Sequence, residues 1–412
     1  MGLGKTYTGS EKLIQLGARV NLLICQKSKI QDWINHFVDN YEVSEHLMVY
    51  DITKWKKSDW YAFSRDPAMQ DDWHGAEKYV LIGNYELVWR RKDLLKLRDF
   101  TLMLDESSLI QNRKAKQTKF ILLLQPANVI LLSGTPTSGK YENLWTQLHL
   151  LGWPISEPLY QRQYINWKTQ RIPGGQTVKV VDKENPYKNV ERLKSKMREY
   201  GAQFLKTDDV MNLPEQNFIE VKVSKPRCYN KFMKDSIVVV DGVELVGDTS
   251  LTKRLYAREL CGIYSDAKFD AFRDLLASTN DRVIVFYNFT AELMKLLRVC
   301  DEAGKVASVV NGQMHCLEAY ENDESSVAFV QYQAGSKGLN LQKANKIIYY
   351  SPTVKCDDWM QSQKRIHRIG QRRPCFYYKL ICEGTVEEDI YRAVQNGMDW
   401  TNVLFERCGH GE

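Results

Sequence analysis

The sequence lacks the cysteine patterns that mark a disulfide framework or a zinc site. Its nine cysteines are scattered singly, and none belongs to a C-x-x-C pair. An odd, unpatterned set argues against both classes and favours a reducing compartment. No apolar run approaches the length of a membrane span, and no signal peptide precedes the first motif. We therefore expect a cytoplasmic protein without a membrane partner.

Repeats of short period, low-complexity tracts and a strong charge bias are also missing. The 412 residues leave room for two or three domains, and 43% hydrophobic with 26% charged residues is ordinary for a globular protein. The net charge of +6 and the pI near 8.6 lean basic. This balance permits a nucleic-acid partner, and it fits a mildly basic soluble protein equally well.

A buried strand before the first motif is a further absence. Met1-Gly2-Leu3-Gly4-Lys5-Thr6 ends in the Gly-Lys-Thr that closes a P-loop. In such a loop, backbone N–H groups cradle the nucleotide phosphates, the lysine reaches the outer phosphates and the threonine hydroxyl holds Mg²⁺. A P-loop normally connects a strand to a helix, and no residue precedes Met1 to form that strand. We expect an N-terminally incomplete phosphate-binding loop.

Short, near-continuous apolar runs alternate with amphipathic stretches at both ends of the chain, which predicts an α/β fold with parallel sheets covered by helices. The strand candidates of residues 1–155 are 20–25, 79–82, 101–104 and 129–132. Those of residues 263–412 are 282–287, 306–310, 327–331, 346–350 and 376–381. Residues 156–262 show hairpin signals at Pro173-Gly174-Gly175 and Asp241-Gly242, with a charged helix at 187–201 between them. We interpret 1–155 and 263–412 as domains, and 156–262 as an insertion and linker.

Two loops that follow predicted strands carry candidate chemistry. Asp105 and Glu106 end the strand Leu102–Leu104, at the sheet edge where ligands bind in open α/β folds. The aspartate can hold Mg²⁺ while the glutamate orients a water against a γ-phosphate. The alternative is a solvated loop that caps a helix from Ser107. In Leu132–Pro136, the Ser133 and Thr135 hydroxyls could sense phosphate, or form a plain turn.

The segment 359–371 has the most informative spacing. If it is helical, Gln361, Arg365 and Arg368 fall at i, i+4 and i+7 and share one face. Guanidinium groups presented together suit phosphate oxygens and could act as arginine fingers. The alternatives are a basic solvated face and a DNA-phosphate patch. His367 fits a packing or hydrogen-bonding role better than a metal ligand. The glycine-rich loop 335–341 permits a close approach of nucleotide or nucleic-acid backbone.

The order and spacing of these motifs resemble the Swi/Snf-like branch of the DExx-box helicase and translocase superfamily, in its phage or prophage form. The similarity covers nearly the whole chain. Met1–Thr6 resembles the end of the family's D-E-M-G-L-G-K-T, and Asp105-Glu106-Ser107-Ser108 takes the place of D-E-A-H. Asn84-Tyr85-Glu86, Leu132–Pro136 and Gln361–Gln371 resemble further family motifs.

The resemblance implies two tandem RecA-like lobes with a small mixed helical and hairpin insertion, which bind ATP between them and move on double-stranded DNA. Glu106 would position water, and Arg365, Arg368 and Gln361 would assist from the second lobe. Thr6 and Asp105 would hold Mg²⁺. The implied nucleotide contacts are Gly2, Gly4, Lys5, Thr6, Ser133, Thr135 and Gly338. The implied DNA contacts are Gln26, Lys27, Ser28, Asn84, Asn288, Ser336, Lys337 and Asn340.

We therefore predict an ATP-dependent DNA translocase, monomeric and located in the cytoplasm of a bacterial host cell. Two alternatives stay open. One is a catalytically weak DNA-binding module whose incomplete P-loop no longer turns over. The other is an RNA helicase, which the L-S-G-T-P and R-I-H-R-I-G-Q forms make less favourable.

Overall fold

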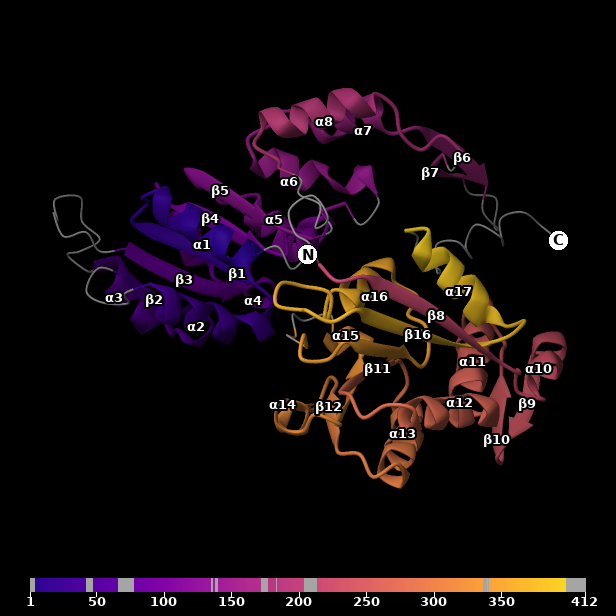
Figure 1. Cartoon of the computed structure of the whole chain (residues 1–412). Helices are drawn as coiled ribbons and strands as arrows, with labels where there is room; N and C mark the ends of the chain where they lie inside the picture. Colours follow the sequence, from indigo (N-terminus) through magenta and orange to yellow (C-terminus); the bar gives the residue numbers. More distant parts are fainter. Residues whose placement is uncertain are drawn as a thin grey trace. The chain divides into compact units, whose positions relative to one another are not determined.

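Two mostly parallel β-sheets organise the computed structural model of the chain, one in each of two units (Figure 1). The first unit comprises residues 4–206 and the second comprises residues from 207 onward. The structure describes residues 4–41, 47–65, 78–134, 136–137, 140–171, 177–182, 184–203, 213–335, 339 and 341–397. None of the helices in these ranges is long and apolar enough to span a membrane.

The first unit contains a five-stranded parallel sheet in the order β2-β3-β1-β4-β5. Its strands are β1 (Val20–Cys25), β2 (Leu47–Asp51), β3 (Lys78–Asn84), β4 (Thr101–Asp105) and β5 (Asn128–Leu132). All four predicted strands are present. The additional strand β2 lies at the sheet edge and is mostly half-buried, so its apolar signal is weaker than that of the central strands.

Helices cover both faces of this sheet because alternate strand residues point to opposite sides. Leu23 and Met103 pack with α1 (Lys5–Gln15) and α2 (Ile30–Asn40). Leu22 and Leu102 face the opposite core. That second core also includes residues from α3 (Lys57–Arg65), α4 (Tyr85–Val88), η4 (Lys92–Lys96) and α5 (Lys116–Ile121). The sheet is therefore buried on both sides, as the near-continuous apolar runs predict.

A small satellite core follows the first sheet. It is built by η6 (Tyr141–Asn143), α6 (Trp145–Leu150), α7 (Glu157–Tyr164) and α8 (Val190–Glu199) around buried aromatic residues such as Tyr160 and Tyr164. Strands β6 (Trp167–Arg171) and β7 (Thr177–Val181) pair antiparallel. These elements confirm the hairpin around Pro173–Gly175 and the helix within 187–201, although the hairpin turn itself lies outside the described residues.

The second unit contains a seven-stranded sheet in the order β13-β12-β14-β11-β15-β16-β8. Its strands are β8 (Gln216–Val223), β11 (Val283–Tyr287), β12 (Ala307–Val310), β13 (His315–Cys316), β14 (Val327–Gln331), β15 (Lys346–Tyr349) and β16 (Cys375–Cys382). All are parallel except β13. The five strands predicted after residue 263 are present, whereas β8 and the two-residue strand β13 were not predicted. Strand β8 lies at one edge of the sheet. It pairs with β16 over eight residue pairs.

Two separate cores flank the second sheet. Val283 and Val285 pack with α12 (Asp266–Ala277) and α13 (Thr290–Glu302). Ile284 and Phe286 face the opposite core. That core includes residues of α14 (Glu318–Asn322), α15 (Tyr332–Gly335), α16 (Cys356–Gln363) and α17 (Val386–Gln395).

A small appendage belongs to the second unit. It consists of α10 (Tyr229–Asp235), β9 (Ile237–Val240), β10 (Val243–Val246) and α11 (Ser250–Ile263). The turn at Asp241-Gly242 has positive φ at both residues (47° and 76°), as a type I′ hairpin requires. The predicted hairpin is therefore confirmed. The segment 156–262, which we interpreted as insertion and linker, is divided between the two units.

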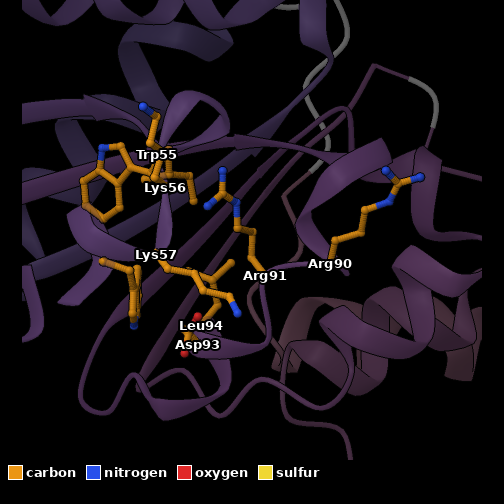
Figure 2. Close-up of a pocket in the computed structure, with 9 residues that line it drawn as sticks. Trp55, Lys56, Lys57, Arg90, Arg91, Asp93 and Leu94 are labelled. Atoms are coloured by element: carbon orange, nitrogen blue, oxygen red, sulfur yellow. The ribbon is translucent and has the colours of Figure 1, made fainter.

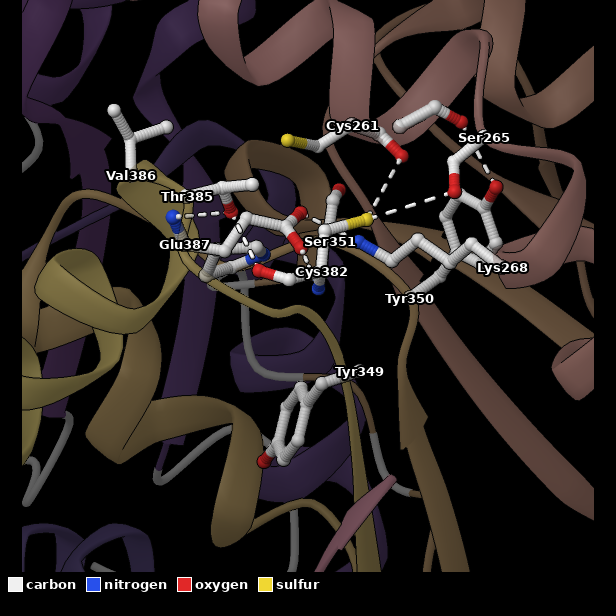
Figure 3. A network of polar contacts seen from close by, with 12 residues as sticks. Cys261, Ser265, Lys268, Tyr349, Tyr350, Ser351, Cys382, Thr385, Val386 and Glu387 are labelled. Carbon is white, nitrogen blue, oxygen red and sulfur yellow. Dashed lines mark hydrogen bonds and ion pairs between the residues drawn. The ribbon is translucent and has the colours of Figure 1, made fainter. Parts of the chain in front are cut away.

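A buried ion pair ties helices of the second unit to strand β16 (Figure 3). The Lys268 ammonium on α12 lies 2.5 Å from a carboxylate oxygen of Glu387 on α17, and both side chains are fully buried. The other Glu387 oxygen accepts the backbone N–H of Cys382 (2.9 Å). Burial is the largest single effect and lowers the pKa of Lys268, but the charge of Glu387 together with its hydrogen bond and the neighbouring Cys382 and Cys261 outweighs it, and the pKa is raised above its usual value. The lysine is therefore held in its charged form.

Candidate ATP-binding site

The first component of the site is the N-terminal end of helix α1. Gly4 occupies the N-cap position with φ of +70°, a conformation that a side chain would strain. Lys5 is half-buried and Thr6 is exposed in the first turn, which contains no acidic residue. The unpaired backbone N–H groups and the positive end of the helix dipole make such a terminus suited to phosphate. Gly2 lies outside the described residues.

Asp105 occupies the carboxyl end of β4, the strand between β1 and β5. One of its carboxylate oxygens accepts a hydrogen bond from the Trp33 indole N–H on α2 (2.9 Å). Burial raises the pKa of Asp105, and the Trp33 hydrogen bond and the Lys5 charge only partly oppose that increase. The Tyr85 hydroxyl donates to the Asp105 carbonyl (3.0 Å) and so connects the Asn84–Glu86 motif to this loop.

Glu106 adopts the left-handed conformation, with φ of 61° and ψ of 60°. Outside glycine this conformation costs roughly 1–2 kcal/mol, and such strain gathers at functional sites. The carboxylate lies 3.7 Å from the Lys5 ammonium. It also accepts hydrogen bonds from the hydroxyls of Ser133 (2.8 Å) and Ser108 (3.1 Å). The structure therefore brings Lys5, Glu106 and Ser133 together, as well as Asp105, from three distant parts of the sequence.

Two glutamines fix the Ser133–Pro136 loop against the Asp105–Ser108 loop. The Pro136 carbonyl accepts hydrogen bonds from the side-chain amides of Gln111 (2.9 Å) and Gln147 (2.7 Å). The Gln147 side-chain oxygen in turn accepts the Ser107 hydroxyl (2.9 Å). Sequence reasoning missed both glutamines because neither belongs to a motif and their partners are 11 to 40 residues away. Thr135 lies outside the described residues.

The DNA contacts predicted on the first unit lie at the same sheet edge. β1 and β3 are neighbours, and Cys25 pairs with Asn84, so Gln26 follows directly beside Asn84. Lys27 and Ser28 are exposed in the short helix η1 (Lys27–Lys29). Asn84 is only 1% exposed, and its amide donates to Glu86 (2.7 Å). In this conformation the Asn84 side chain offers DNA no surface, whereas Lys27 and Ser28 do.

The arginine motif of the second unit corrects one prediction. Helix α16 ends at Gln363, so Gln361, Arg365 and Arg368 do not share a helical face. The consecutive residues Arg365, Ile366 and His367 are all buried, which a single helix face cannot achieve. The chain continues in turns to Gly370, whose φ is +93°.

Hydrogen bonds to the backbone fix these turns. Gln371 donates to the Ala344 carbonyl (2.8 Å), and the Arg365 guanidinium donates to the Leu339 carbonyl (3.2 Å). His367 lies 2.9 Å from the Pro214 carbonyl oxygen, which agrees with the predicted hydrogen-bonding role. Arg368 is half-buried, and burial lowers its pKa below the usual arginine value.

The remaining predicted residue of the second unit that the structure describes is Asn288, at the end of β11. Its amide donates to the Ser351 hydroxyl (2.8 Å) and the Pro352 carbonyl (2.9 Å). The side chain therefore joins two loops of the unit. Ser336, Lys337, Gly338 and Asn340 lie outside the described residues.

Cys261, Cys382 and Glu387 form one further group of possible metal ligands in the described part of the chain. All three are buried, and their ligand atoms lie within 4.8 Å of one another. The Lys268 ammonium already neutralises Glu387 at 2.5 Å and would repel a cation at this place (Figure 3). The group therefore fits a structural network better than a metal site.

The two units, each a mostly parallel sheet with helices on both faces, have the architecture of RecA-like lobes, and in the first unit a glycine-capped helix N-terminus lies beside Asp105 and Glu106. The sequence profile of the SNF2-related domain matches residues 1–261, and that of the helicase conserved C-terminal domain matches residues 267–370. The chain belongs to the SNF2-related family.

Relatives of this family are distributed widely. The SWI/SNF-related matrix-associated actin-dependent regulator of chromatin subfamily A member 1 of Mus musculus is 26% identical over 99% of this chain and 41% of its own length. The putative ATP-dependent helicase/translocase YwqA of Bacillus subtilis is 24% identical over 70% of this chain and 34% of its own length. The chain thus spans about two fifths or less of these two relatives. Among solved structures, the Sulfolobus solfataricus SWI2/SNF2 ATPase core in complex with dsDNA covers 96% of this chain and 85% of its own, at 19% identity and a TM-score of 0.39.

Proposed function

We propose that the protein couples ATP hydrolysis to movement along double-stranded DNA. The observation that carries this proposal is the grouping of Lys5, Asp105 and Glu106 at the N-terminal end of α1 and the carboxyl end of β4. A helix terminus suited to phosphate and two acidic side chains beside it are the parts that phosphoryl transfer to water requires. Membership of the SNF2-related family supports DNA as the track.

ATP binds with its phosphates at the N-terminal end of α1. Lys5 exchanges its contact with Glu106 for the outer phosphates, and Glu106 then orients a water molecule. The water oxygen attacks the γ-phosphorus, the bond to the ADP oxygen breaks, and the water proton passes to solvent or to Glu106. Ser133 keeps the Glu106 carboxylate in place, because its hydroxyl donates to that carboxylate.

The site also fits a magnesium ion. Thr6 presents an exposed hydroxyl, and Asp105 presents a carboxylate of which the Trp33 indole occupies one oxygen. Hard oxygen ligands of this kind suit Mg²⁺, which supplies charge neutralisation on the phosphates when bound. We further propose that Arg365 and Arg368 assist hydrolysis and that Gln26, Lys27 and Ser28 contact DNA.

The test is ATP hydrolysis by the purified protein with no polymer, with double-stranded DNA and with single-stranded RNA. We expect stimulation by duplex DNA, and loss of hydrolysis in Lys5→Ala. Lys12→Ala, an exposed lysine of the same helix, is the matched control and is expected to keep activity. Displacement of a DNA triplex strand reports movement. Binding of DNA without hydrolysis favours the catalytically weak module, and equal stimulation by RNA favours an RNA helicase.

A further inference from the structure

A pocket of about 130 Å³ on the first unit combines an apolar floor with a basic rim (Figure 2). It lies beyond the carboxyl ends of β2 and β3, where η2 (Ile52–Lys54), the start of α3, the turn after α4 and η4 come together. The lining residues are Ile52, Trp55, Lys56, Lys57, Trp60, Arg90, Arg91, Asp93 and Leu94. None of them belongs to the nucleotide site or to the predicted DNA contacts.

The floor of the pocket is rigid and apolar. Ile52 and Leu94 are 2% and 1% exposed and belong to the core that α3, α4, η4 and α5 form on one face of the first sheet. Trp55 is half-buried, with its ring centroid 5.5 Å from that of Tyr50 and 5.3 Å from that of Phe63. These ring contacts hold the indole in place before any ligand arrives. The volume is of the order of the roughly 150 Å³ cavity that accommodates benzene, so it suits a single large apolar side chain.

The rim is positively charged. Four of the nine lining residues are basic and one is acidic, and that one, Asp93, is paired with Lys96 outside the pocket (3.4 Å). Arg91 is oriented by a hydrogen bond to the Thr53 carbonyl (3.1 Å). Lys56 and Lys57 are exposed, and within the described residues neither ammonium forms an ion pair, although the Asp59 carboxylate accepts the backbone N–H of Lys56 (2.6 Å). In Figure 2 the Arg90 side chain points away from the other labelled residues, so Lys56, Lys57 and Arg91 supply most of the charge at the opening.

We propose that this pocket is a docking site for an acidic peptide segment of a partner protein, with one aromatic or large aliphatic side chain seated on the floor and flanking carboxylates on the rim. Charge complementarity selects the acidic segment, and the apolar floor selects the anchor. A DNA backbone would use the lysines but leave the floor unfilled. A stacked base needs an open ring face, and the packed position of Trp55 limits that arrangement.

The test uses fluorescence anisotropy without nucleotide, so that its outcome is independent of ATP hydrolysis. The probe is a labelled peptide Gly-Asp-Asp-Phe-Asp-Asp-Gly. Two control peptides replace Phe by Ser or each Asp by Asn. We expect the probe to bind, and each control peptide to bind about tenfold more weakly, since both the anchor and the charges contribute.

Variants of the rim locate the site. Lys56→Glu and Lys57→Glu reverse exposed charges and are expected to weaken binding of the probe about tenfold. Lys92→Glu, an exposed lysine of η4 outside the pocket, is the matched control and is expected to bind as the unmodified protein does. Equal binding of the Phe and Ser peptides, no binding at roughly 1 mM probe, or equal effects of all three variants would overturn the proposal. A second result would also overturn the proposal. If short duplex DNA displaces the probe, and Lys56→Glu and Lys57→Glu weaken binding of that duplex, the pocket binds nucleic acid instead.

Discussion

The Lys5 ammonium lies 3.7 Å from the Glu106 carboxylate, which joins the first turn of α1 to the carboxyl end of β4. Both side chains are partly exposed, so the contact is weak and exchangeable. A phosphate at the helix terminus can therefore take over the lysine, and the glutamate becomes available to orient water. In the mechanism proposed above, the pair links the binding of nucleotide to the orientation of water by Glu106.

Ser133→Ala is expected to lower the rate of hydrolysis more than the affinity for ATP. The Ser133 hydroxyl donates to Glu106 at 2.8 Å, and a hydrogen bond to a charged group contributes about 1.5–3 kcal/mol. The expected decrease in kcat is about ten- to a hundredfold, with KM for ATP nearly unchanged. Steady-state kinetics measure both, with Ser64→Ala, an exposed serine of α3, as the control. A change in KM alone would show that Ser133 acts in binding.

Asp105→Asn is expected to stabilise the protein at neutral pH while abolishing hydrolysis. The folded-state pKa of Asp105 is raised above its ordinary value of 3.8 by burial, so the folded state binds the proton more tightly than the unfolded state. The contribution of Asp105 to the free energy of unfolding is therefore fully present below its unfolded pKa, and it is lost as the pH rises through its folded pKa. Asparagine can still accept the Trp33 hydrogen bond without carrying a charge.

Thermal unfolding at several pH values tests this expectation. The Asp105→Asn variant should unfold at a higher temperature than the unmodified protein at pH 7, and the difference should shrink as the pH falls towards the unfolded pKa of 3.8. Asp39→Asn, an exposed residue of α2, is the control. A variant that is less stable at pH 7 would show that the Asp105 charge stabilises the loop.

Lys268→Ala is expected to destabilise the second unit by about 3–5 kcal/mol, because it leaves the Glu387 carboxylate buried without its partner. The double variant Lys268→Met with Glu387→Leu removes both charges and should be less destabilised than the sum of the single variants Lys268→Met and Glu387→Leu, which complete the cycle with the unmodified protein. Chemical denaturation of all four proteins gives the coupling free energy. Strict additivity would mean that the two residues contribute independently.

The central strands of both sheets could be predicted from the sequence because helices cover both faces and each strand is a near-continuous apolar run. Strands β2, β8 and β13 were missed because they lie at sheet edges and are partly or fully exposed, so their sequences mix apolar and polar residues. The end of α16 at Gln363 was missed because neither proline nor glycine marks it. Tertiary hydrogen bonds of Gln371 and burial of Ile366 determine the turns that follow.

Within the site, Lys5, Asp105, Glu106 and Ser133 could be predicted because each stands in a motif whose chemistry is local. The residues that hold these loops and side chains by hydrogen bonds could not be predicted. Gln147, Gln111 and Trp33 reach the site only through pairings across 11 to 72 residues, which no local pattern encodes. The burial of Asn84 likewise follows from its position at the end of a covered strand.

The most direct test of the account is a comparison of ATP binding and ATP hydrolysis in Glu106→Gln. Glutamine keeps the size of the side chain and one oxygen that can accept the Ser133 and Ser108 hydroxyls, but its amide cannot accept a proton from water. We predict that equilibrium binding of ATP is preserved or strengthened, since Lys5 is freed from its ion pair, while DNA-stimulated single-turnover hydrolysis falls by roughly a hundredfold or more. Hydrolysis at the unmodified rate in this variant would contradict the assignment of Glu106, and with it the central claim.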